Sequence, residues 1–208
     1  MVKRGNNDNI DTWEQRKLGE NASFSKGSGY SKSDLKTEGC PAILYGRLYT
    51  NYETEINVVD TFVEPKQGAV YSQGNEVIVP ASGETAEDIA RASFVTSKGI
   101  ILCGDLNIVR PTNGLNPSFL ALLISNGAAQ KELSKKAQGK SVVHIHNSDI
   151  EQLEVLFPCK QEQERISSTF RSLDSLLTLH QRKQICLFLV IESFLYICLK
   201  KGGLLYGN

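Results

Sequence analysis

The longest regular pattern of hydrophobic and polar positions lies in residues 162–194. Apolar side chains recur there at alternating steps of three and four residues, which is typical of a coiled-coil helix. The eight positions of this seam, with a polar one in the middle, are Ile166, Phe170, Leu173, Leu177, His180, Leu187, Ile191 and Phe194. A helix over residues 161–199 would be on the order of 58 Å long, more than a compact domain of this size needs for its own core. No other segment matches its length, so the pattern predicts a partner helix from another chain.

The upstream part of the chain carries short β-type runs separated by turn residues, which predict a sheet. These runs cover residues 42–45, 55–63, 69–71, 76–79, 99–103, 107–109 and 141–146. Pro80 is expected to end the strongest of them. Residues 21–39 are rich in Ser, Gly, Lys and Asn and predict a loop.

Three short helices are indicated by capping signals and periodicity. Thr85 with Asp88 resembles a capping box, and Asn116 followed by Pro117 is typical of a helix start. The predicted helices span residues 86–92, 117–125 and 128–137. Pro158 separates this part from the long helix. The expected fold is therefore an α/β (α+β) domain with a mixed or antiparallel sheet over residues 11–158, a flexible leader over 1–10, and a long C-terminal coiled-coil helix within 159–208.

Composition and charge restrict the class of protein. Lys plus Arg and Asp plus Glu both total 23, so no global basic charge indicates nucleic acid. Residues 51–110 carry nine acidic and four basic side chains, whereas the flanking segments are mildly basic, which favours a local anion-binding face. The five cysteines form no paired framework, and this indicates a reduced, cytoplasmic setting. The apolar run 185–199 is shorter than the roughly 20 residues of a membrane span, so no membrane association is expected.

Three fragments imitate catalytic motifs. FSKGSGY at residues 24–30 and NPSF at 116–119 are reminiscent of an adenine methyltransferase, but the glycines neither follow an apolar strand nor open a helix, and NPSF is explained by helix capping. His144 and His146 would share one strand face, yet two imidazoles are too few for a metal site. The acidic group Glu84, Glu87 and Asp88 is expected to cap and solvate a short helix. Catalysis by this chain is therefore not expected, and no metal is predicted.

Polar, aromatic and basic residues on predicted loops are the remaining candidates for function. Lys and Arg can position phosphates, while Asn, Thr and Arg can read base edges. The candidate DNA contacts are Lys26, Tyr30, Lys32, Arg47, Tyr49, Thr50, Asn51, Tyr52, Lys136 and Lys140. Composition alone leaves the alternative of an ordinary solvated surface open.

Several segments together resemble the specificity subunits of type I restriction-modification enzymes. They are DTWEQRKLGE at 11–20, LYGRLYTNYET at 44–54, GNEVIVPASGETAEDIARAS at 74–93, ISNGAAQKELSKKAQGKSVVHIHNSDI at 124–150, and the later EQERI and LHQRK. The resemblance implies a non-catalytic target-recognition domain that binds one half of a split double-stranded DNA sequence. It also implies docking of methyltransferase subunits, which would bring S-adenosylmethionine, and association with restriction subunits.

The chain departs from that family's pattern in two respects. Such subunits normally hold two recognition domains and two helices that pair antiparallel, whereas this chain has one of each. We therefore expect a homodimer or pairing with another half-subunit. Its tail, residues 184–199, is apolar where the family is rich in Lys and Glu. Two other functions remain open: a protein-binding adaptor without DNA, and an N6-adenine methyltransferase using Gly27, Gly29 and Asn116.

Overall fold

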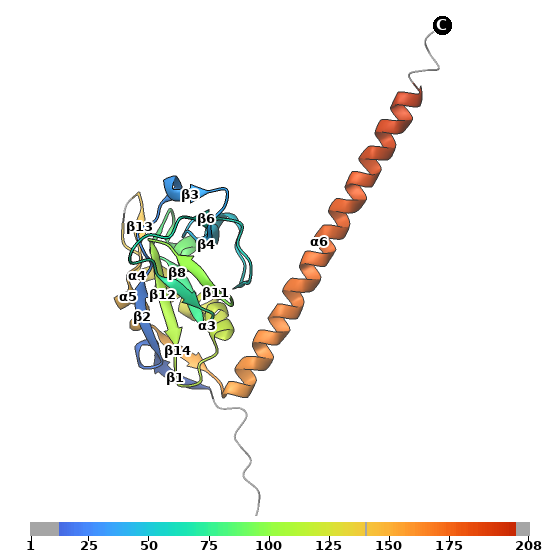
Figure 1. The fold of residues 1–208 in the computed structure, drawn as a ribbon. Helices are drawn as coiled ribbons and strands as arrows, with labels where there is room; N and C mark the ends of the chain where they lie inside the picture. The colour runs from blue at the N-terminus through green and yellow to red at the C-terminus, as the bar shows by residue number, and fades with distance from the viewer. Residues whose placement is uncertain (1–12, 140, 203–208) are drawn as a thin grey trace, which may run out of the picture. The chain divides into compact units, whose positions relative to one another are not determined.

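Two five-stranded sheets form the framework of the first unit of the chain (Figure 1). The computed structural model describes residues 13–139 and 141–202 and divides into two units, residues 1–165 and 166–208. In the first sheet the strands follow the order β2 (Ala22–Lys26), β12 (Leu106–Pro111), β8 (Glu76–Pro80), β10 (Ser93–Val95) and β5 (Glu55–Ile56). In the second sheet the order is β3 (Leu35–Lys36), β6 (Phe62–Val63), β4 (Cys40–Ile43), β11 (Lys98–Leu102) and β7 (Tyr71–Gln73). Both sheets are mixed, because β10 pairs parallel with β5 and β11 pairs parallel with β4.

Two small antiparallel ribbons complete the β-structure. One joins β1 (Glu14–Lys17) to β14 (Glu154–Phe157), and the other joins β9 (Ser82–Gly83) to β13 (Val143–His144). The first ribbon brings residues at the start and the end of the globular unit together. The second fastens the segment before the helix Ala86–Ile89 to the loop near residue 142.

The core follows from the period of two along strands β4 and β11. Ile43, Ile100 and Leu102 belong to one apolar cluster together with Ile78 and Ile108 of the first sheet. The alternate residues Ala42, Ile101 and Cys103 belong to a second cluster with Tyr30 and Val63. Since successive side chains of a strand point to opposite faces, these two strands are buried on both sides.

The helical elements are short except for the last. They are η1 (Leu18–Glu20), η2 (Lys32–Asp34), α1 (Arg47–Thr50), α2 (Ala86–Ile89), α3 (Pro117–Ile124), α4 (Gly127–Lys136), α5 (Asn147–Glu151) and α6 (Lys160–Gly202). Both predicted caps are confirmed: Phe119 N donates to Asn116 Oδ1 at 3.0 Å, and Asp88 N donates to Thr85 Oγ1 at 3.1 Å.

The start of α6 is tied to the cap of α3. The Gln163 side chain is 2% exposed; its Oε1 accepts from Asn116 N at 2.8 Å, and its Nε2 donates to Pro158 O at 2.9 Å. One amide side chain therefore satisfies backbone groups at two element boundaries.

Helix α6 confirms the predicted long helix, running from Lys160 to Gly202. Phe170, Leu173 and Leu177 are 46%, 48% and 60% exposed, so this stretch of the seam is uncovered in a single chain. The seam residues Leu187, Ile191 and Phe194 fall where side chains are outside the described residues. The coiled coil itself stays a prediction. Within the described part of the chain, no helix is long and apolar enough to cross a membrane.

The helix expected over residues 86–92 covers only Ala86–Ile89. Three expectations about loops and strands were also wrong. Residues 21–39 are not one loop, because β2 pairs along its whole length with β12 and η2 and β3 follow it. Residues 55–63 form two two-residue strands instead of one long strand, and 141–146 contributes only Val143–His144. In each case the partner strand decides the extent of pairing, and that partner is distant in sequence.

Glu76 is a buried carboxylate that holds the turn between β7 and β8. It is 0% exposed, and its two oxygens accept from the backbone amides of Gln73, Gly74 and Asn75 at 2.8 to 3.2 Å. Arg110 Nε pairs with it at 3.2 Å. Both carboxylate oxygens of Glu76 therefore accept hydrogen bonds, as a buried carboxylate requires.

We expect Glu76→Gln to lower the free energy of unfolding by about 3–5 kcal/mol, because it removes one partner of a buried ion pair and faces an amide NH₂ toward backbone donors. Urea unfolding followed by circular dichroism measures this. Glu87→Gln, on the exposed face of α2, is the matched control and should change stability by no more than about 0.5 kcal/mol. Equal effects of the two substitutions would contradict the role given to Glu76.

Candidate nucleic-acid interface

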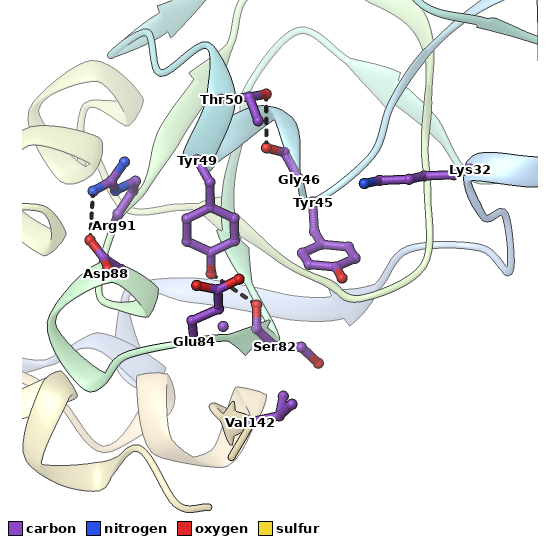
Figure 2. Close-up of a pocket in the computed structure, with 11 residues that line it drawn as sticks. Lys32, Tyr45, Gly46, Tyr49, Thr50, Ser82, Glu84, Asp88, Arg91 and Val142 are labelled. Atoms are coloured by element: carbon purple, nitrogen blue, oxygen red, sulfur yellow. Dashed lines mark hydrogen bonds and ion pairs between the residues drawn. The ribbon is translucent and has the colours of Figure 1, made fainter. Parts of the chain in front are cut away.

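A pocket of about 520 Å³ lies where α1, β9, α2 and the loop before β13 meet (Figure 2). Its size is in the range of ligand-binding pockets. The lining residues are Lys32, Tyr45, Gly46, Tyr49, Thr50, Ser82, Gly83, Glu84, Asp88, Arg91 and Val142. Four segments that are far apart in sequence therefore build one concave surface with both charge signs.

The wall between α1 and β9 is fixed by a close approach at Gly83. The Tyr49 hydroxyl donates to the Ser82 carbonyl at 2.8 Å. A Cβ on Gly83 would lie 2.8 Å from the Tyr49 Oη and 3.0 Å from the Ile89 Cβ, so a larger residue would displace the Tyr49 hydroxyl. This close approach favours glycine at position 83 and leaves the hydroxyl free to reach the Ser82 carbonyl.

Arg91 joins α1 to α2 behind that wall. Its Nη1 donates to the Leu48 carbonyl at 3.0 Å, and its Nη2 pairs with Asp88 Oδ1 at 3.3 Å. The guanidinium carbon lies 5.8 Å from the ring centroid of Tyr49 and 5.2 Å from that of Tyr52. The guanidinium of Arg91 is thus held by hydrogen bonds and cation–π attraction within the protein.

Burial raises the pKa of Tyr49 above its ordinary value, with the nearby Arg91 cation acting in the opposite direction. Asp88, Tyr45 and Glu84 add to the upward shift of this pKa. The phenol therefore stays protonated at neutral pH and remains a donor to Ser82. The Tyr49 hydroxyl therefore stabilises the pocket wall through Ser82, and its proton is not available to a bound anion.

The structure brings three of the predicted DNA contacts together in this pocket: Lys32, Tyr49 and Thr50. Asn51 and Tyr52 follow directly at the end of α1; Asn51 is exposed, and the Tyr52 hydroxyl donates to the Ala92 carbonyl at 3.2 Å. Candidates from the first loop and from the 47–52 segment therefore lie at one pocket, and their contact with DNA stays a prediction.

Arg47 is placed differently from its neighbours. Its side chain is 10% exposed, and it pairs with Glu53 at 2.7 Å and with Asp60 at 2.9 Å. It also donates to the Val58 carbonyl at 3.3 Å. In this arrangement Arg47 organises the loop 51–60, and its charge is already balanced.

The other predicted contacts lie outside the pocket. Tyr30 is 7% exposed, and its hydroxyl accepts from Lys66 N at 2.7 Å, so it packs in the core. Lys26 has an exposed side chain at the end of β2; partial burial of its ammonium group lowers its pKa, while Asp105 and Asp149 oppose that shift. Lys136 lies near Glu132 on α4 at 3.9 Å. Lys140 lies outside the described residues.

The fragments that imitate catalytic motifs have structural roles. A Cβ on Gly27 would lie 1.8 Å from the Cys103 carbonyl oxygen, so this glycine permits close packing against β11. Asn116 caps α3, and His144 Nδ1 lies 3.1 Å from Ser82 Oγ. In the described portion of the chain, no three His, Cys, Asp or Glu side chains are grouped so that they could hold a metal ion.

Sequence reasoning did not single out Tyr45, Ser82, Gly83, Arg91 or Val142 for the pocket. One signal for Arg91 was available, since it stands three residues after Asp88 within the helix expected over residues 86–92; the structure ends that helix at Ile89 but keeps the ion pair. The others depend on contacts between distant segments.

A family model and solved structures point to the same protein family. The model for the type I restriction modification DNA specificity domain matches residues 10–187. A comparison with curated protein sequences gives no match.

Three solved structures share the fold. The HsdS subunit from Thermoanaerobacter tengcongensis is 17% identical with a TM-score of 0.57, and covers 83% of this chain and 40% of its own. The type I restriction-modification S subunit from M. genitalium is 19% identical with a TM-score of 0.56, covering 81% and 40%. A structure described as showing complex assembly and conformational transition of the type I R-M system is 16% identical with a TM-score of 0.59, covering 83% and 40%. The chain thus spans about 40% of the length of these chains.

The raised pKa of Tyr49 predicts a specific alkaline behaviour. Above about pH 10 the unfolded chain loses the phenol proton while the folded chain keeps it, so the free energy of unfolding falls as pH rises through the unfolded value. Tyr49→Phe should cost about 1 kcal/mol at neutral pH for the lost hydrogen bond. That cost should shrink above about pH 10, measured by urea unfolding across this range. Tyr71→Phe, at a ring that is 43% exposed, is the control. A cost for Tyr49→Phe that is independent of pH would contradict the assignment.

Proposed function

Since the chain belongs to the family of type I restriction modification DNA specificity domains, we propose that it recognises one half-site of a bipartite DNA target in a type I restriction-modification complex. The family match over residues 10–187 carries this proposal, because it includes the globular unit and the first part of α6. The chain is then a recognition component, and the methylation chemistry, with its S-adenosylmethionine, belongs to partner methyltransferase subunits.

The pocket and its surroundings provide the chemistry that such a component needs. Lys32 is exposed at its edge, and Thr50 and Asn51 are exposed at the end of α1. A lysine can neutralise a phosphate, whereas hydroxyl and amide groups can bond to base edges. With 23 basic and 23 acidic residues, the chain alone has little general attraction for DNA. Much of the phosphate binding would accordingly come from the methyltransferase subunits.

The second part of the proposal is that α6 pairs with an α6 helix of another chain. Phe170, Leu173 and Leu177 expose an apolar stripe that a second helix would cover. The chain that supplies the paired helix would then also supply the recognition domain for the other half of a bipartite target. A two-fold symmetric homodimer would read two inverted copies of one half-site, with a spacer determined by the helices.

Methylation mapping of host DNA with and without this gene tests the proposed function. We expect a methylated motif that is present only with the gene and consists of two inverted half-sites around a spacer. A nonsymmetric bipartite motif would indicate pairing with a different half-subunit. An unchanged methylation pattern, in a host that expresses the methyltransferase, would contradict DNA recognition by this chain.

Charged substitutions in the seam test the pairing. Leu173→Glu with Leu177→Glu should convert a dimer of the full chain into a monomer in sedimentation velocity, because two carboxylates would be buried in an apolar contact. Ser175→Glu is the matched control, since Ser175 lies on the exposed helix between them and outside the seam. Its dimer should persist. A wild-type chain that is monomeric at every concentration would contradict the homodimer.

A further inference from the structure

We propose that the pocket reads an amino-bearing base, preferentially cytosine, through the carboxylate of Glu84. This inference rests on the proposed DNA recognition and names the base chemistry of one site within it. The argument depends on which lining groups are already committed, and on what a carboxylate can accept from DNA.

Most polar groups of the pocket are engaged within the protein. The Tyr49 hydroxyl donates to the Ser82 carbonyl, and Thr50 Oγ1 donates to the Gly46 carbonyl at 3.1 Å. Asp88 Oδ2 accepts from Thr85 Oγ1 at 2.7 Å, and Asp88 Oδ1 pairs with Arg91. These groups build the wall with their own hydrogen bonds, and the Thr50 hydroxyl can only accept from a ligand because its proton is used.

Glu84 is the carboxylate that remains available. It is exposed, it lines the pocket, and it makes no hydrogen bond or ion pair with the residues that the structure describes. It follows directly after Gly83, whose backbone is held against Tyr49 and Ile89. The Glu84 carboxylate is therefore attached to a backbone that is held by packing. Such preorganisation helps a side chain to discriminate between bases.

Electrostatics restricts what this carboxylate can meet on DNA. Phosphates repel it, so Glu84 has no favourable contact with the backbone of the duplex. Among major-groove base edges only the N4 amino group of cytosine and the N6 amino group of adenine donate a hydrogen bond. Adenine carries the acceptor N7 beside its amino group, which a carboxylate disfavours. Cytosine presents the donor without that acceptor and is therefore the preferred base.

The positive charge needed to attract the DNA phosphates comes from Lys32. In Figure 2 Lys32 enters the pocket from the right, across from Arg91 and Asp88. Arg91 is committed to Leu48 and Asp88, so Lys32 is the cation suited to a phosphate beside the base. The rings of Tyr45 and Tyr49, 6.3 Å apart and nearly perpendicular, form the apolar part of the wall between the two ends.

The test compares base preferences of matched variants. The full-length chain in complex with its methyltransferase subunit selects from randomised DNA duplexes, as wild type, Glu84→Gln, Glu84→Ala and Glu87→Gln. Glu87 is exposed on α2, three residues after Glu84, and does not line the pocket, so it controls for the loss of one negative charge. Thermal unfolding of each variant establishes that it folds.

We expect the wild type to prefer cytosine at one position of the half-site by roughly tenfold, and Glu84→Ala to lose this preference. Glu84→Gln should turn the preference at that position toward adenine, because an amide can both accept from N6 and donate to N7. Preferences at the other positions should stay the same. Glu87→Gln should raise binding to random DNA as much as Glu84→Gln does and leave every preference unchanged.

The alternative outcomes separate the two levels of the proposal. If the wild type reads a sequence and the Glu84 variants read the same one, the pocket assignment is overturned and DNA recognition stands. If the Glu84 variants alter only assembly with the methyltransferase, the pocket binds protein and the assignment again fails. If the wild-type complex shows no preference at any position, the proposed function itself fails.

Discussion

Strands β4 and β11 are buried on both faces, and the remaining architecture depends on that constraint. Their alternating side chains supply two separate apolar clusters, so neither strand can shift register without moving apolar groups into the wrong layer. Leu44 and Tyr45 follow β4 immediately, and α1 begins two residues later. The helix that carries Tyr49 and Thr50 therefore leaves a strand that is anchored in both clusters, and the pocket wall that it forms lies next to the core.

The sequence predicted those parts of the fold whose causes are local. Asn116 and Thr85 cap helices because each needs only an amide three residues away. The buried strand β8 was evident from a continuous run of β-type residues before Pro80, and the long α6 from its periodicity. Strand β2 was not, because it is rich in Ser and Lys and its strand character comes from pairing with β12, about 85 residues later. Helix α1 has four residues, too few for a helical period to show.

The candidate site shows the same division between local and distant causes. Residue type indicated suitable chemistry at Lys32, Tyr49 and Thr50, and the fold gathers these three. Residue type could not indicate exposure, because exposure depends on partners elsewhere. Arg47 is neutralised by Glu53 and Asp60, and Tyr30 is covered in the second cluster. The roles of Glu84 and Gly83 required knowing that β9 lies against α1.

Three hydrogen bonds around the pocket end on backbone carbonyls. Tyr49 bonds to the carbonyl of Ser82, Arg91 to that of Leu48, and Tyr52 to that of Ala92. These bonds depend on the side chains of Tyr49, Arg91 and Tyr52, but they make no demand on the side chains of Lys32 or Glu84. Substitutions at Lys32 or Glu84 can then be accepted without loss of the fold. A lineage could in this way acquire new recognition sequences by single changes, while the scaffold that displays them is inherited intact.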